Sequence, residues 1–324
     1  MTQQLEPLLP IVVIGGPTAS GKTALAVEVA LELDSEIVSA DSRQIYRHMD
    51  IATAKPTSIE MKGVKHHALD LIEPDASFSA GAFARLAYEK MEELWQKNKI
   101  PVLAGGSGMY IKAVIEGLFE DPFDYGAIRV ELQEELQQKG PEFLYAELAD
   151  LDPVAALRLD RGDSQRLLRA LEIARARIGS RATEYKGMHR AWDSGSNQNV
   201  LPVFFAIDHD RSTLYRRINQ RAAGMWSGGL LDEIGRLERL GYDETSCAMK
   251  TMGYEEGWAC HKGQIAPEAA LEKIQRRTRQ YAKRQMTWFR GDRRARWLDP
   301  DRGGLKGMVK RVLAQTLYLA EECR

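Results

Sequence analysis

The stretch Gly16–Thr23 has the residue types and the spacing of a phosphate-binding loop. Its sequence, GPTASGKT, matches the pattern G-x-x-x-x-G-K-[ST], and an apolar run, PIVVIGG, leads directly into it. Glycines let successive backbone N–H groups point inward at an anion, and the N-terminus of a following helix adds positive potential. The predicted loop comprises Gly16, Pro17, Thr18, Ala19, Ser20, Gly21, Lys22 and Thr23.

Lys22 and Thr23 supply the charge and the hydroxyl that a phosphate ester needs. We expect Lys22 to neutralise phosphate oxygens and Thr23 to offer its hydroxyl to Mg²⁺. A nucleotide and another diphosphate ester would satisfy these groups equally well. The motif therefore leaves the identity of the ligand open.

Two more polar residues follow predicted strands, where ligands of parallel sheets collect. Asp41 comes directly after EIVSA, and its carboxylate could ligate Mg²⁺ through water, cap a helix or act as a general base. Ser107, in GGSG, could reach a leaving-group oxygen or cap the helix of MYIKAVI. The adjacent His66 and His67 would face opposite ways on a strand, which disfavours a metal pair.

Short apolar runs bounded by Gly, Asp or Pro predict the strands that position these residues. The runs are PIVVIGG, EIVSAD, ALDLIE, PVLAGG and PVFFAID, with ARWLD as a short further candidate. Helical patterns such as 23–33 and 78–98 separate them. Strands that alternate with helices predict an α/β fold with a doubly wound parallel sheet, and the loop makes it similar to P-loop NTPases.

The ninety or so residues between PVLAGG and PVFFAI have almost no strand signal. Helical stretches lie near Arg129–Lys139, Pro141–Leu148 and Ser164–Ile178. We therefore predict a core domain from 1–122 and 200–324, with a helical C-terminal part, and an all-helical insertion at 123–199. Asp193–Asn199, DSGSNQN, has the composition of a linker.

Charge is distributed unevenly along a chain whose net charge is only −1. Residues 271–300 contain ten Lys or Arg against three Asp or Glu, and residues 165–190 contain seven against two. Such asymmetry indicates a nucleic-acid-binding face better than the net charge does.

The beginning of the chain has no basic segment before its short apolar run, and the three cysteines lack CxxC spacing. We expect a cytoplasmic protein without a membrane segment, and a monomer by default.

Eight segments, taken in order, resemble bacterial tRNA dimethylallyltransferases, the IPP transferase family. They span about 11–299 and read GPTASGKT, DSRQIYRHMDIATAKP, HHALDLIEP, VLAGGSGMYIKA, QRLLRALEI, LYRRINQRAAGM, MKTMGYEEG and TRQYAKRQMTWFR. The resemblance implies transfer of the dimethylallyl group of dimethylallyl diphosphate to the exocyclic amine of the adenosine 3′ of the anticodon. The kinase-like loop would then hold the diphosphate of a prenyl donor.

The same resemblance implies roles for individual side chains. Asp41 would be the general base for the amine, since a neutral aryl amine is a poor nucleophile. Lys22, Mg²⁺ at Thr23, and either Arg217 or Arg221 of RRINQR would stabilise the departing diphosphate. Ser107 stands where the family has threonine, so its hydroxyl role should survive.

The sequence departs from the family pattern at two further positions. His48 and Ala52 replace glycines that are common in the family, in a stretch that reads RHMDIATAKP here. We expect these changes to affect the local backbone and not the chemistry.

An adenosine of the anticodon loop must leave its stack to enter a closed pocket. Arg43 and Gln44 would lie beside the base, where an amide can pair with its edge. In KIQRRTRQYAKRQMTWFR, the basic residues Arg276, Lys283 and Arg290 recur every seven residues, opposite an apolar row. The predicted tRNA-binding residues are Asp41, Ser42, Arg43, Gln44, Ser107, Arg129, Gln165, Arg166, Arg169, Lys250, Arg277, Lys283 and Arg284.

Two other functions remain as alternatives. A P-loop kinase of a small metabolite or nucleotide would explain the loop and Asp41, but not the basic helical C-terminal half. An RNA-binding regulator with a vestigial loop would not need Lys22, Thr23 and Asp41, which are intact here.

Overall fold

The computed structural model describes residues 8–117, 125–178 and 200–322. The chain divides into two compact units, Met1–Leu118 with Ser196–Arg324, and Phe119–Gly195. The predicted boundaries at 122/123 and 199/200, and the linker proposed at Asp193–Asn199, lie wholly or partly outside the described residues.

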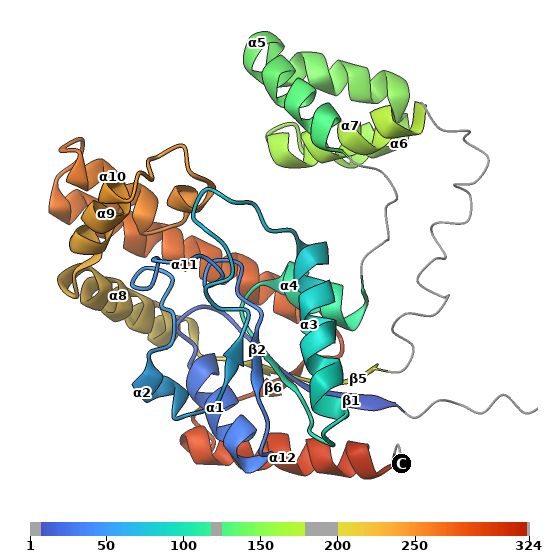
Figure 1. Ribbon diagram of the computed structural model, residues 1–324, viewed down its shortest axis with the longest axis vertical. Helices are drawn as coiled ribbons and strands as arrows, with labels where there is room; N and C mark the ends of the chain where they lie inside the picture. Colours follow the sequence, from blue (N-terminus) through green and yellow to red (C-terminus); the bar gives the residue numbers. More distant parts are fainter. Residues whose placement is uncertain (1–7, 118–124, 179–199, 323–324) are drawn as a thin grey trace, which may run out of the picture. The chain divides into compact units, whose positions relative to one another are not determined.

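A six-stranded parallel sheet forms the first unit, in the order β3-β2-β4-β1-β5-β6 (Figure 1). This architecture confirms the predicted α/β class. The strands are β1 (Leu9–Gly15), β2 (Ile37–Ser39), β3 (His66–His67), β4 (Val102–Ala104), β5 (Val200–Ile207) and β6 (Arg296–Leu298).

Alternate residues of β1 face two separate cores, which explains why the strand is apolar throughout. Ile11 and Val13 pack with α3 and α4, whereas Val12 and Ile14 pack with α1 and α12. The covering helices are α1 (Lys22–Glu32), α3 (Ala80–Trp95), α4 (Gly108–Ile115) and α12 (Gly304–Glu322).

The register of the three inner strands brings their carboxyl ends to one level. Ala104 of β4 pairs with Ile14 of β1 on one side and with Ser39 of β2 on the other. Gly105 then packs against the β2 end so closely that a Cβ there would lie 2.0 Å from the Ala40 carbonyl oxygen. The chain segments that follow β1, β2 and β4 therefore meet at one edge of the sheet.

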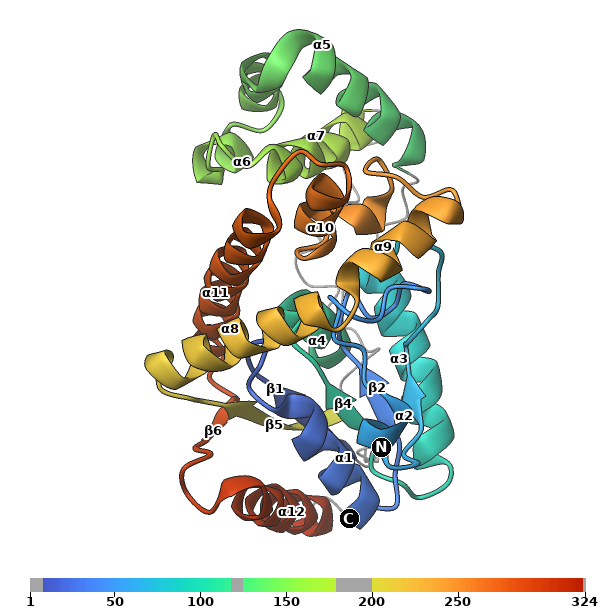
Figure 2. The ribbon, with the colours of Figure 1, turned by 90° about the vertical axis from the view of Figure 1, so that its left-hand side faces the viewer.

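A group of helices from the C-terminal half lies on the side of the sheet away from α12 (Figure 2). It surrounds a third core, to which Ile45, Tyr46 and Met49 from the segment after β2 also belong. The elements are α8 (Arg211–Ser227), α9 (Leu230–Arg239), the 3₁₀ turn η2 (Cys247–Lys250), α10 (Tyr254–His261) and α11 (Pro267–Gly291). The short α2 (Ser58–Met61) follows the segment after β2 and contacts α1.

The second unit is helical throughout its described residues and has its own core. It consists of α5 (Gly126–Leu151), α6 (Pro153–Arg158) and α7 (Ser164–Ile178). Leu132, Leu144 and Leu171 are fully buried within it. Gly140, at φ 79°, kinks α5 before Pro141, as expected from the break between the two predicted helices. The sequence analysis did not predict α6.

One predicted strand was wrong. The run ALDLIE does not pair along its length; β3 ends at His67, and only Ile72 makes an isolated bridge, to Tyr46. Ala68 and Asp70 have positive φ values of 64° and 51°, which break the extended conformation. In the part of the chain that the structure describes, no helix has the length and apolar character needed to cross a membrane.

Candidate functional site

A cavity opens at the edge of the sheet where the ends of β1, β2 and β4 meet. The phosphate loop, the segment after β2, α8, α9, α11 and the residues 251–253 before α10 contribute to its lining. Its lining includes Thr18, Ala19, Lys22, Thr23, Ser39, Asp41, Arg43, Gln44, Thr53, His66, Gly105, Gly106, Arg221, Met225, Leu230, Ile274, Tyr281 and Gln285.

The phosphate loop has the geometry of an anion cradle. Ala19 and Gly21 adopt positive φ values of 63° and 96°, and α1 begins at Lys22 directly behind them. The Lys22 ammonium donates to the Pro17 carbonyl at 2.7 Å. Burial lowers the pKa of Lys22 to about 7, an effect that Asp41 opposes and Arg221 increases. An arriving diphosphate would reverse this shift by stabilising the charged ammonium.

Asp41 fixes the turn after β2 and also faces the cavity. Its Oδ1 accepts the backbone N–H groups of Arg43 at 2.8 Å and Gln44 at 3.4 Å, which fixes the turn after β2. Its carboxylate also lines the cavity. Among the described residues no donor is bonded to Oδ2, so this oxygen is available to take a proton.

Ser107 bridges the second glycine-rich turn to the segment after β2. Its hydroxyl accepts the N–H of Ser42 at 2.9 Å and donates to the Ser42 hydroxyl at 3.2 Å. Ser107 is the N-cap residue of α4 but makes no side-chain capping bond. Gly105 and Gly106 line the cavity, whereas Ser107 does not. The structure thus gives Ser107 a positioning role, and the predicted direct contact with the leaving group stays a prediction.

The two arginines proposed for the diphosphate lie differently on α8. The Arg217 Nε donates to the Ala19 carbonyl at 2.7 Å and so braces the phosphate loop from outside. Arg221 lines the cavity, and its Nη1 lies 3.5 Å from the Thr18 hydroxyl. Of the two arginines between which the sequence left the choice open, Arg221 is therefore the better placed for the expected diphosphate contact.

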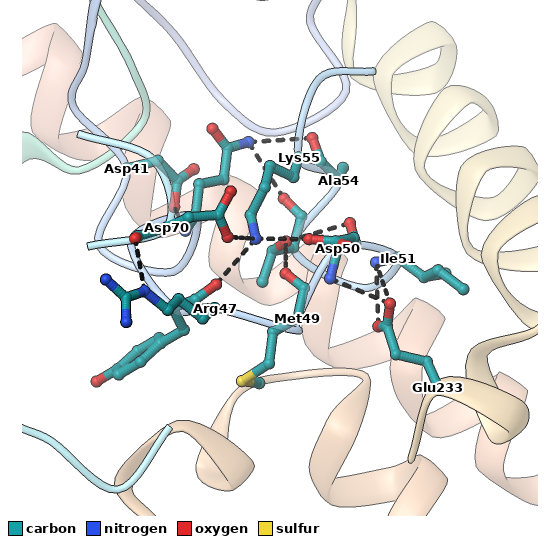
Figure 3. Close-up of polar contacts among 12 residues, drawn as sticks. Asp41, Arg47, Met49, Asp50, Ile51, Ala54, Lys55, Asp70 and Glu233 are labelled. Carbon is teal, nitrogen blue, oxygen red and sulfur yellow. Dashed lines mark hydrogen bonds and ion pairs between the residues drawn. The ribbon is translucent and has the colours of Figure 1, made fainter. Parts of the chain in front are cut away.

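The segment between β2 and α2 is held from two directions (Figure 3). The buried carboxylate of Glu233 accepts the N–H groups of Asp50 at 3.2 Å and Ile51 at 3.1 Å. The Lys55 ammonium, whose side chain is 6% exposed, pairs with Asp50 at 2.5 Å and Asp70 at 2.6 Å. The segment is therefore a fixed wall of the cavity. Nothing in the sequence pointed to Glu233.

Gln44 is bonded to three groups of the cavity wall. Its Nε2 donates to the carbonyls of Thr53 at 3.3 Å and Ala54 at 3.0 Å, and its Oε1 accepts from the Ser39 hydroxyl at 3.1 Å. A carboxamide nitrogen has two N–H donors, and both are used here, whereas the oxygen has a second lone pair. The contact of Gln44 with a base edge stays a prediction, with the amide oxygen as the group that can make it.

His48 and Ala52 replace glycines that are common in the family, and they were expected to affect the local backbone. His48 has a φ of 65°, a conformation that glycine adopts without steric cost. Ala52 has an ordinary negative φ, but its Cβ lies where a side chain on Gly253 would collide, at 2.6 Å. Both replacements are accommodated in this backbone.

Several of the predicted tRNA contacts lie in ion pairs within the protein. Arg129 is bonded by two nitrogens to the buried Glu172, at 2.7 and 3.0 Å, and Arg169 meets the same carboxylate at 3.0 Å. Arg277 pairs with Glu255 at 2.7 Å and with the fully buried Glu256. Arg129 and Arg277 therefore have carboxylate partners within the protein, and their contact with tRNA stays a prediction.

Other predicted tRNA contacts are exposed within their own units. In the insertion these are Gln165 and Arg166; in the core they are Arg43, Lys250, Lys283 and Arg284. On α11, Arg276 and Arg290 are exposed as well, while Ile274 is buried, as expected for basic residues that recur every seven residues opposite an apolar row.

Comparisons with known proteins all point to one family. Residues 44–292 match the family model described as IPP transferase. The chain is 42% identical to tRNA dimethylallyltransferase 1 of Syntrophotalea carbinolica, over 90% of this chain and 91% of the relative. It is 40% identical to the tRNA dimethylallyltransferase of Desulforudis audaxviator, over 94% and 96% of the two chains.

Solved structures show the same relationship. The tRNA isopentenylpyrophosphate transferase of Bacillus halodurans aligns with a TM-score of 0.67 at 33% identity, over 97% of this chain and 96% of that one. The corresponding transferase of Staphylococcus epidermidis aligns with the same TM-score at 35% identity, over 95% and 98%. The chain belongs to the IPP transferase family.

Proposed function

We propose that this protein transfers the dimethylallyl group of dimethylallyl diphosphate to the exocyclic N6 amine of the adenosine 3′-adjacent to the anticodon of tRNA. Family membership supports the class of reaction. The observation that carries the chemistry is that Asp41 and the phosphate loop line the same cavity. There a base can take the proton of the attacking amine while an anion-binding loop holds the departing diphosphate.

In the proposed reaction the amine nitrogen attacks the first carbon of the dimethylallyl group. The bond from that carbon to the diphosphate oxygen breaks, and diphosphate leaves with the bonding electrons. Asp41 takes the proton that the amine loses. Lys22 and Arg221 bind the oxygens on which negative charge grows, so they stabilise the transition state more than the donor.

Oxygen donors suited to Mg²⁺ are present beside the phosphate loop. The Thr23 hydroxyl and the Asp41 carboxylate both line the cavity, and Mg²⁺ prefers hard oxygen ligands. We propose that Thr23 holds Mg²⁺ together with the donor's own phosphate oxygens. When bound, the ion would neutralise charge on the diphosphate.

Exposed basic side chains of each unit are the proposed contacts for the tRNA backbone. In the core these are Arg43, Lys250, Lys283 and Arg284, and in the insertion Arg166. Contacts of this kind make binding depend on salt concentration. The monomeric state and the cytoplasmic location stay predictions.

The first experiment is label transfer from dimethylallyl diphosphate to tRNA that lacks the modification, with Mg²⁺ and without ATP. Prenylated adenosine in the digested tRNA is the expected result. If tRNA bound but stayed unmodified until ATP was supplied, the loop would serve a nucleotide and the kinase alternative would replace this proposal.

A further inference from the structure

Gln285 of α11 lies between the phosphate loop and the second glycine-rich turn. Its side chain is almost completely buried, with 7% of the residue exposed. Oε1 accepts the N–H of Thr18 at 2.9 Å, and Nε2 donates to the carbonyl of Gly106, also at 2.9 Å. One amide therefore joins two main-chain turns that are far apart in the sequence.

Gly106 is shaped to receive this amide. A Cβ at that position would lie 2.4 Å from the Gln285 nitrogen, so only glycine leaves room for the side chain to reach the backbone. Because a buried polar group without a partner is costly, the amide and the two turns hold one another in a single arrangement.

Hydrogen bonds continue from Gly106 to the turn that holds the base. The neighbouring Ser107 donates its N–H to the Ala40 carbonyl at 3.1 Å and accepts the N–H of Ser42 at 2.9 Å. Asp41 lies between Ala40 and Ser42 in the chain. The path from Thr18 through Gln285, Gly106 and Ser107 thus connects the phosphate loop to Asp41.

We propose that Gln285 is a positioning residue for prenyl transfer, which fixes the distance between the diphosphate and the base. This inference rests on the proposed function. In the displacement, the carbon–oxygen bond breaks at the phosphate loop while a carbon–nitrogen bond forms near Asp41 and the carboxylate takes a proton. Both ends must be aligned at once, and a misplacement of about 1 Å can cost on the order of 10²-fold in rate.

Two substitutions separate this role from simple packing. Gln285→Met keeps the volume and removes both hydrogen bonds, and should slow single-turnover transfer by about 10- to 100-fold at saturating donor, with tRNA affinity unchanged. Gln285→Glu can accept from Thr18 when ionised, but needs a proton to donate to Gly106. Its rate relative to wild type should therefore recover as the pH falls from about 8 to about 6, because burial raises a carboxyl pKa.

Met286→Leu is the matched control, since Met286 is the next residue on α11, is buried, and the exchange conserves volume. Its rate should stay within about twofold of wild type. A wild-type single-turnover rate for folded Gln285→Met would overturn the proposal. So would a Gln285→Glu rate that follows the wild-type pH profile.

Failure of the proposed function gives a different result. In that case wild type and Met286→Leu would transfer no dimethylallyl group either. Titration calorimetry with inorganic diphosphate then tests the link from Thr18 through Gln285 to Gly106 by itself. In Gln285→Met the Thr18 backbone loses its anchor, so the affinity for diphosphate should fall by about tenfold. Equal diphosphate affinities of wild type and Gln285→Met would then overturn the positioning role of Gln285.

Discussion

The two ends of the cavity are built in different ways. At the phosphate end, one continuous stretch of eight residues, Gly16–Thr23, supplies the backbone, the charge and the hydroxyl. At the acceptor end, Asp41 is placed by a segment that Glu233 of α9 and Lys55 hold in shape. The ligand-binding groups of the first end are contiguous in the sequence, whereas those of the second end are brought together by contacts across the fold. Substitutions at each end should therefore fail differently.

The largest effect is expected at Asp41. Asp41→Ala should lower turnover by about 10²- to 10⁴-fold while leaving tRNA affinity largely intact, because the base is lost. Asp41→Asn separates the two functions of this side chain: it keeps an oxygen for the N–H groups of Arg43 and Gln44 but cannot take a proton. Both variants should lose turnover alike in a single-turnover assay, and near-normal turnover of Asp41→Asn would exclude the base assignment.

A difference between two arginines tests the phosphate end. Arg221→Ala should lower kcat/KM for dimethylallyl diphosphate by about 10²- to 10³-fold, since it removes a donor from the developing charge. Arg217→Ala removes the brace on the Ala19 carbonyl and should act mainly on the KM for the donor. Steady-state kinetics of both variants decide the assignment, and a larger kcat loss in Arg217→Ala would assign the diphosphate contact to Arg217 instead.

The difference between the two ends explains which site residues could be predicted from the sequence. The loop could be recognised because all of its groups are contiguous, and Asp41 and Ser107 because parallel strands end at one edge. Glu233 and Gln285 gave no signal, since their partners lie 183 and 267 residues away along the chain.

The wrong strand prediction and the unexpected partners of Gln44 have local physical causes. The run ALDLIE has the apolar character of a strand, but the positive φ values of Ala68 and Asp70 depend on the surrounding fold. For Gln44, residue type and proximity to Asp41 suggested a base contact. The carbonyls of Thr53 and Ala54 that occupy its donors become neighbours only after the segment folds back.

Donor binding should depend on pH through Lys22. Because the pKa of Lys22 in the free protein is about 7, its amino group is largely neutral above that pH. Binding of the diphosphate must then be accompanied by uptake of a proton. Affinity should fall by about tenfold per pH unit above about 7 and gain nothing from this group below it. Calorimetry near pH 8 in two buffers of different ionisation enthalpy should detect uptake of about one proton per site.

Lys22→Arg is the control for this dependence, because a guanidinium stays charged throughout the range. Its diphosphate affinity should lack the decline above pH 7 that Lys22 causes. A wild-type affinity that does not change between pH 7 and 9 would contradict the shifted pKa.

Glu233 tests the acceptor end through stability. Glu233→Ala leaves the N–H groups of Asp50 and Ile51 and the hydroxyl of Tyr254 without their buried acceptor. The free energy of unfolding should drop by about 2–3 kcal/mol in urea titrations. Turnover of the folded fraction should fall only a few-fold, with the KM for dimethylallyl diphosphate unchanged, and a selective rise in that KM would show that the two ends are not independent.

The smallest effect is expected at the junction between the two ends. Ser107→Thr restores the residue common in the family and keeps the hydroxyl that accepts from Ser42. Since the added methyl mainly narrows the choice of side-chain rotamers, turnover should stay within about twofold of wild type. Ser107→Ala is the matched change that removes the hydroxyl and leaves the Ser42 N–H without its acceptor. If Ser107→Thr lost as much turnover as Ser107→Ala in the label-transfer assay, the turn would have no room for the family's threonine, and serine would be a structural requirement of this chain.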